Sequence, residues 1–208
     1  MSQSDVDELF GLVYRYYPKR CSFTSLAYRE SFEYSRYLDI VKDLNKRAIM
    51  DKKLFSIISK IADGYSIMMR EHSDYVNYPS LQYTILLHKN RLFLDDDVDL
   101  ILSLGGKRLD LELYFSLLGD YYYYYIIETD GGKDTSSWNF SILKDEQLPH
   151  EEMMLARKLC SKAISLGFKM LDHNIAHVLV PEVETELINS GEATIFNCLF
   201  TETVTRYY

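Results

Sequence analysis

The chain has 208 residues, of which 47% are hydrophobic and 26% are charged, close to the averages for globular proteins. These fractions exclude a disordered or fibrous protein, and we expect residues 1–208 to form a single domain around one core. The 23 basic and 31 acidic residues give a net charge of -8, which opposes nonspecific attraction to nucleic acid and to anionic lipid.

Helices are predicted for the N-terminal part of the chain, about residues 4–63. Apolar residues at helical spacing follow Ser4, and we expect Pro18 to stop this first helix. A second apolar stripe predicts a long helix that begins near Ser25. A third stripe ends just before Gly64, because glycine readily adopts the left-handed conformation that commonly follows a helix.

Strands are predicted for about residues 65–145, because the apolar period changes there from 3.6 to 2. Gly105-Gly106 and Gly119-Asp120 fit hairpin turns, which need residues that tolerate positive φ. Tyr121 to Glu128 is expected to pair back as a strand, and a short strand follows the loop that begins at Asp130. The apolar members of the first three strands are Leu81, Tyr83, Ile85 and Leu87, then Val98, Leu100, Leu102 and Leu104, then Leu109, Leu111, Leu113 and Phe115.

One later helix is predicted for about residues 149–167, with acidic residues in its first turn, lysines further on and Gly167 at its end. Beyond it, residues 178–181 and 193–201 are expected to be extended, and residues 182–189 fit either a strand or a short helix. Helices and strands are grouped along the chain instead of alternating. The sequence therefore predicts an α+β fold, in which an antiparallel β-meander sheet carries the N-terminal helices and the later helix.

Two features of the strand region are candidates for a partner-binding surface. The three aspartates that begin at Asp95 lack the glycine and the terminal glutamate of a calcium loop, so they indicate either a solvated turn or a contact with a basic partner. Five tyrosines run from Tyr121 to Tyr125, and alternate side chains of a strand point to opposite faces. One set either covers a sheet face, as a good strand former does, or faces a partner, because tyrosine is common in interfaces. The residues that we assign to a partner-binding surface are Asp95, Asp96, Asp97, Tyr122, Tyr124 and Glu128.

Asp172, His173 and His177 form a cluster of residue types that can bind a metal ion. Two histidines four residues apart share a face if the segment is helical, but the glutamate of the HExxH motif is missing and no third ligand follows from spacing. One alternative function is therefore a small metal-dependent hydrolase that uses these three residues. Another is a structural homo-oligomer with exposed aromatic residues at its interface. Because the sequence has no recognisable catalytic or cofactor motif, we expect a protein that is not an enzyme and that binds neither a metal nor a cofactor.

Short acidic and tyrosine-containing patches occur near both ends of the sequence. These patches are Tyr16-Tyr17-Pro18-Lys19, Tyr28, Ser31-Phe32-Glu33-Tyr34, residues 181–187 and residues 191–196. Together they resemble the small acidic immunity proteins of bacterial polymorphic and contact-dependent toxin systems. The resemblance implies a non-catalytic inhibitor that binds one cognate toxin domain and covers its active site, and it transfers no functional residue. An acidic, aromatic surface would suit a basic catalytic cleft, because opposite charges raise the association rate.

The expected location follows from the start of the chain and from its hydropathy. The first residues are polar and acidic, where a secretory signal would place a basic patch and an apolar run. No stretch approaches the roughly 20 apolar residues that cross a bilayer. We therefore expect a cytoplasmic protein whose partners include neither membrane nor nucleic acid, and in which a basic toxin domain is the partner.

Overall fold

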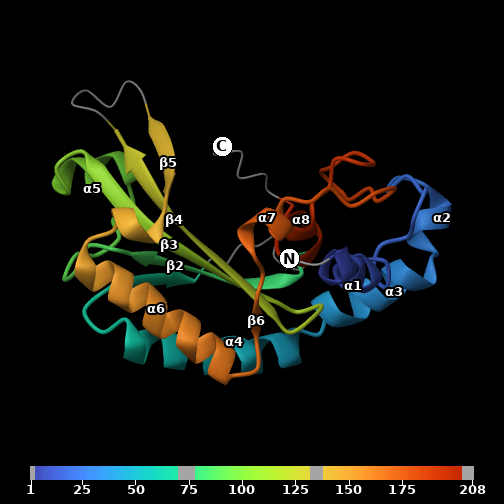
Figure 1. The fold of residues 1–208 in the computed structure, drawn as a ribbon, viewed down its shortest axis with the longest axis horizontal. Helices are drawn as coiled ribbons and strands as arrows, with labels where there is room; N and C mark the ends of the chain where they lie inside the picture. The colour runs from blue at the N-terminus through green and yellow to red at the C-terminus, as the bar shows by residue number, and fades with distance from the viewer. Residues whose placement is uncertain (1–2, 70–77, 132–137, 203–208) are drawn as a thin grey trace.

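The centre of the protein is a six-stranded sheet, which the computed structural model describes with its helices for residues 3–69, 78–131 and 138–202. Strands β1 to β5 lie in chain order as an antiparallel meander, and the short β6 pairs in parallel with β4 (Figure 1). The predicted α+β fold with an antiparallel meander is confirmed. The strands are β1 (Ser66–Met69), β2 (Ser80–Leu86), β3 (Lys107–Ser116), β4 (Tyr121–Asp130), β5 (Asn139–Leu143) and β6 (Lys169–Met170).

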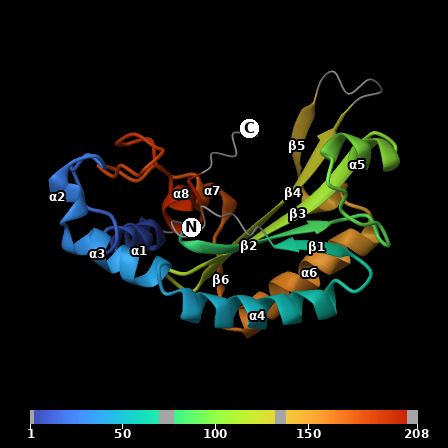
Figure 2. The ribbon, with the colours of Figure 1, turned by 180° about the vertical axis from the view of Figure 1, so that it is seen from behind.

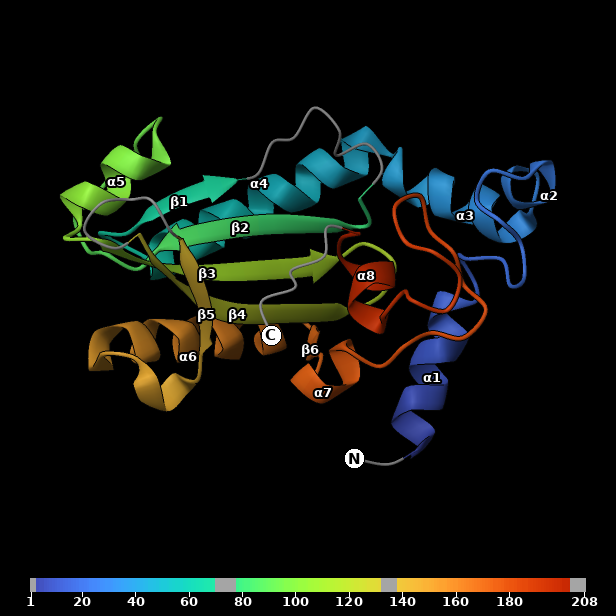
Figure 3. The same cartoon turned by 90° about the horizontal axis from the view of Figure 1, so that it is seen from above.

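Helices cover both faces of this sheet. The two longest, α4 and α6, lie on one face, while α7 and α8 lie on the other and α1 lies beside α8, past the ends of the strands (Figures 1 and 3). Helix α5 lies at the end of the sheet that is remote from α7 and α8 (Figure 2). The helices are α1 (Gln3–Val13), α2 (Leu26–Arg29), α3 (Phe32–Val41), α4 (Leu44–Ile61), α5 (Asp97–Ser103), the 3-10 helix η2 (Asp145–Gln147), α6 (His150–Ser165), α7 (His173–Ala176) and α8 (Ile195–Leu199).

The first core lies between the sheet and helices α4 and α6. Directly opposite residues of antiparallel strands share a face, so the register that pairs Leu113 with Tyr124 and Phe115 with Tyr122 sends all four side chains toward these helices. Leu155, Leu159 and Ala163, which lie at helical spacing on α6, pack there. The other buried members include Leu54, Ile58, Leu81, Tyr83, Ile85, Leu111 and Ile126.

The second core lies on the opposite face and is largely aromatic. Tyr114, Tyr123 and Tyr125 project from the sheet toward the C-terminal helix α8, where Tyr123 meets Phe196 with ring centroids 5.1 Å apart. Helix α1 packs against α8, so the N-terminal helices are divided between the two sides of the sheet. The buried residues Leu9, Leu12 and Val13 of α1 complete this core.

Residues 97–103 form helix α5, so the prediction of a strand from Val98 to Leu104 is wrong. Leu100 and Ile101 are adjacent in sequence and both are buried, whereas Leu102 is exposed, a pattern that suits a helix and not an alternating strand. Gly105 and Gly106, with φ of 85° and 98°, connect α5 to β3 and are not a hairpin turn. The apolar residues from Val98 to Leu104 fit both the strand period of 2 and the helical period of 3.6. The helix cap at Asp96 decides between the two.

Residues 195–199 form helix α8, and the prediction of an extended segment is wrong there as well. Thr194 and Asn197 form a capping box, in which each side chain bonds to the backbone of the other residue. Because Ile195 to Phe200 is buried on every side, the segment has no polar face to mark its period. The capping pair Thr194 and Asn197 is the one feature of the sequence that indicates a helix here.

The predicted N-terminal helices have different limits. Helix α1 ends at Val13, ahead of Pro18, and Ser31 and Asp43 cap new helices within what was expected to be one long helix from Ser25. Gly64, with φ of 82°, follows α4 as expected. Residues 132–137 of the loop predicted after Asp130 lie outside the described residues.

Candidate partner-binding surface

Asp95, Asp96 and Asp97 lie at the N-terminus of helix α5. The side chain of Asp96 accepts a hydrogen bond from the backbone N–H of Asp99 at 3.0 Å and so caps the helix. Negative charge at a helix N-terminus is stabilised by the helix dipole. The acidic run is therefore explained in part by its role in starting α5.

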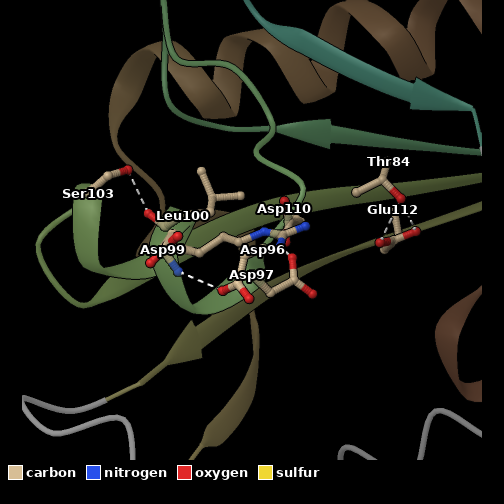
Figure 4. A network of polar contacts seen from close by, with 9 residues as sticks. Thr84, Asp96, Asp97, Asp99, Leu100, Ser103, Asp110 and Glu112 are labelled. Carbon is tan, nitrogen blue, oxygen red and sulfur yellow. Dashed lines mark hydrogen bonds and ion pairs between the residues drawn. The ribbon is translucent and has the colours of Figure 1, made fainter.

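Arg108 connects α5 to the sheet through two carboxylates. Its guanidinium lies 2.6 Å from Oδ1 of Asp97 and 2.6 Å from Oδ2 of Asp110. Figure 4 labels both carboxylates. The guanidinium also stacks over the ring of Phe93, 5.3 Å from its centroid. One cation thus joins two anions, and the group keeps a net negative charge.

Asp110 is a buried carboxyl group on the face of the sheet opposite α4 and α6. Its residue is only 4% exposed, and its Oδ1 has no hydrogen-bond partner among the described residues. Burial raises the pKa of Asp110 to about 6, because desolvation outweighs the opposing attraction of Arg108. The local energetics of this carboxyl therefore change with pH near neutrality.

Glu112 lies two residues further along β3 on the same face. The hydroxyl of Thr84, its partner across the strands, lies 3.0 Å from each carboxylate oxygen of Glu112 (Figure 4). Thr84 and Glu112 belong to a row of buried polar side chains that crosses three strands on this face. The row comprises Ser80, Gln82 and Thr84 of β2, Asp110, Glu112 and Ser116 of β3, and Thr129 of β4.

Exposed leucines flank the aspartates of α5. Leu92 is 75% exposed, Leu94 is 46% exposed and Leu102 is 50% exposed. They belong to the same eleven-residue stretch as four exposed aspartates, among which Asp97 forms an ion pair with Arg108. We call this stretch the α5 surface and define it as Leu92, Leu94, Asp95, Asp96, Asp97, Asp99 and Leu102.

Tyr122 does not face outward, which corrects its assignment to a partner-binding surface. It is fully buried beneath α4 and α6, and Tyr124, on the same face, packs against the same core. The alternate tyrosines Tyr123 and Tyr125 are buried in the second core on the other face. Alternation divided the tyrosines correctly between two faces, but helices cover both of them.

Glu128 lies on the same sheet face as Tyr122 and forms an ion pair with Lys107 at 2.9 Å. Lys107 also lies 3.4 Å from Asp130. Glu128 is therefore on the opposite face of the sheet from Asp110, which Arg108 links to α5. Of the six assigned residues, the structure brings together the three aspartates and separates them from Tyr122, Tyr124 and Glu128.

The histidine cluster lies at helix α7, where Asp172 caps the helix by accepting a bond from the N–H of Asn174. His173 and His177 share a face, as their spacing predicts, with ring centroids 4.7 Å apart. Nδ1 of His173 bonds to the hydroxyl of Tyr123 at 2.7 Å, and burial together with His173 lowers the pKa of His177. Within the described residues, no group of three or more His, Cys, Asp or Glu side chains is arranged to hold a metal ion.

Comparisons of the chain with family models, with curated proteins and with solved structures find no match. None of the helices in residues 3–69, 78–131 and 138–202 combines the length and the apolar character that a membrane crossing requires. The chemistry of the surfaces described above is therefore the basis on which we infer a function.

Proposed function

We propose that the protein is a non-catalytic binding protein of the immunity type, which neutralises a cognate bacterial toxin domain by covering its active site. The α5 surface is the part that contacts this partner. The observation that carries the proposal is the mixture of exposed leucines and aspartates in one short stretch that starts and forms α5. The resemblance to acidic immunity proteins supports the same class of function.

The composition of the α5 surface suits a protein partner better than solvent. A leucine exposed singly is ordinary, but three exposed leucines in eleven residues give this stretch more exposed apolar side chains than solvent contact alone explains, and interfaces bury such side chains. The surrounding carboxylates give specificity for a basic surface and increase the association rate. The net charge of -8 acts in the same direction at longer range.

Co-expression of this chain with any toxin domain that a neighbouring gene encodes, followed by co-purification, tests the proposal. We expect a complex of defined stoichiometry that lacks the toxin's activity. The variant Leu92→Ala/Leu102→Ala should weaken the complex at least about tenfold, because each truncation removes apolar surface from the interface. Leu26→Ala/Leu44→Ala is the matched control, since these leucines are 68% and 60% exposed outside the α5 surface.

Two results would count against the proposal. A toxin domain that neither binds this chain nor loses activity in its presence contradicts the proposed class of function. A complex that forms normally with Leu92→Ala/Leu102→Ala, and is weakened instead by the control variant, leaves the function in place but contradicts its assignment to α5.

A further inference from the structure

A groove between helices α4 and α6 gathers basic side chains on a protein that is otherwise acidic. Its volume is about 540 Å³, and four of its seven lining residues are basic. It shares no residue with the α5 surface. The polar residues that line it are Lys60 of α4 and Arg157, Lys158, Ser161, Lys162 and Ser165 of α6.

The positive charge of this groove is not balanced within it. The lining residues include no carboxylate, and none of the four basic residues takes part in an ion pair within the described part of the chain. Four cations therefore share one groove although acidic residues outnumber basic ones by 31 to 23 in the chain. An anion that entered would meet attraction from every charged side chain that lines the groove.

Helix stability explains only part of this arrangement. Lys60 and Lys162 lie in the last turns of α4 and α6, where the helix dipole favours a cation. Lys158 and Lys162 are four residues apart on one helix, a like-charge spacing that destabilises a helix by a few tenths of a kcal/mol. Arg157 lies in the middle of α6, where the dipole gives it no advantage. A ligand that neutralises the groove would remove this repulsion.

We propose that the groove binds a small, soluble ligand that carries two or more phosphate groups. Arginine presents a planar set of donors that matches phosphate oxygens, and lysine adds point charges. The Ser161 hydroxyl is a further donor at the same wall. A long polyanion or an anionic membrane would also face the net charge of -8 outside the groove, which opposes both.

Titration of the full chain with pyrophosphate at constant ionic strength, followed by amide chemical shifts, tests this proposal. We expect saturable shifts at residues 60–61 and 157–165 with a Kd of about 1 mM or lower. Lys158→Gln/Lys162→Gln keeps an unbranched polar side chain and a similar helix propensity, and should weaken binding at least about tenfold. Lys52→Gln/Lys53→Gln removes the same charge from exposed positions of α4 outside the groove and should bind like the wild type.

Three outcomes would overturn the proposal. The first is the absence of saturable shifts with pyrophosphate in the wild-type protein. The second is equal binding by Lys158→Gln/Lys162→Gln, which would place the anion elsewhere. Because a lipid headgroup offers the same chemistry, the third comes from sedimentation with phosphatidylcholine vesicles that contain a phosphoinositide. Retention on these vesicles without any response to pyrophosphate would exclude a soluble ligand.

Discussion

At the scale of single residues, Asp110 couples folding to pH. Its pKa of about 6 in the folded protein lies above the ordinary value of 3.8, so between these values the folded state binds more protons than the unfolded state. The stabilising contribution is complete below about pH 4 and is lost as the pH rises through about 6. The folded state is thus favoured more strongly when Asp110 is protonated than when it is ionised.

We therefore expect the free energy of unfolding of the wild type, minus that of Asp110→Asn, to fall by about 1 to 3 kcal/mol from pH 4 to pH 7. Urea denaturation at several pH values measures both proteins. Taking the difference removes the contributions of groups common to both, including Glu202, whose pKa is also raised by burial. A difference that is constant, or that rises with pH, would show that Asp110 is not buried in this way.

Tyr122 provides a test of the tyrosine run at the same scale. Because its side chain is fully buried under α4 and α6, Tyr122→Ala should lower the free energy of unfolding by about 3 to 5 kcal/mol. Thermal or urea denaturation measures the loss. If Tyr122 lay on an exposed face, the same change would stay within about 0.5 kcal/mol.

At the scale of elements, the beginning of α5 depends on one side chain. Asp96→Ala removes the cap on the N–H of Asp99 and should destabilise the protein by about 1 kcal/mol. Asp95→Ala is the matched control, because it removes a neighbouring exposed carboxylate that does not cap the helix. Equal effects of the two substitutions in urea denaturation would contradict the capping role.

The elements differ in how far the sequence predicts them. Strands β2, β3 and β4 and helix α6 have one clear period and are predicted, whereas α5 and α8 are not. In α5 the consecutive apolar residues Leu100 and Ile101 fit either period, and in α8 burial on all sides removes the period altogether. Local caps, at Asp96 and Thr194, carry the information that hydropathy lacks in both places.

At the scale of the whole molecule, the grouping of helices and strands predicts the α+β meander but not what covers each face of the sheet. Alternation correctly places Asp110 opposite Leu109 and Leu111, yet it does not show that both faces are buried there. The exposure and burial of the residues assigned to the candidate surface were likewise only partly predictable from the sequence. The aspartates of this surface were proposed from sequence, while the exposure of Leu102 depends on the helical form of residues 97–103, and the burial of Tyr122 depends on the position of α4 and α6.

The affinity for the toxin domain as a function of salt tests the central claim, that carboxylates of the α5 surface bind a basic partner. At low salt, Asp95→Asn/Asp99→Asn should bind about tenfold more weakly than the wild type, and the two should converge as salt screens the exposed charges. Asp39→Asn/Asp63→Asn removes equal charge from exposed positions on α3 and after α4 and should behave more like the wild type. Equal affinities for the Asp95→Asn/Asp99→Asn variant and the wild type at every salt concentration would contradict the claim.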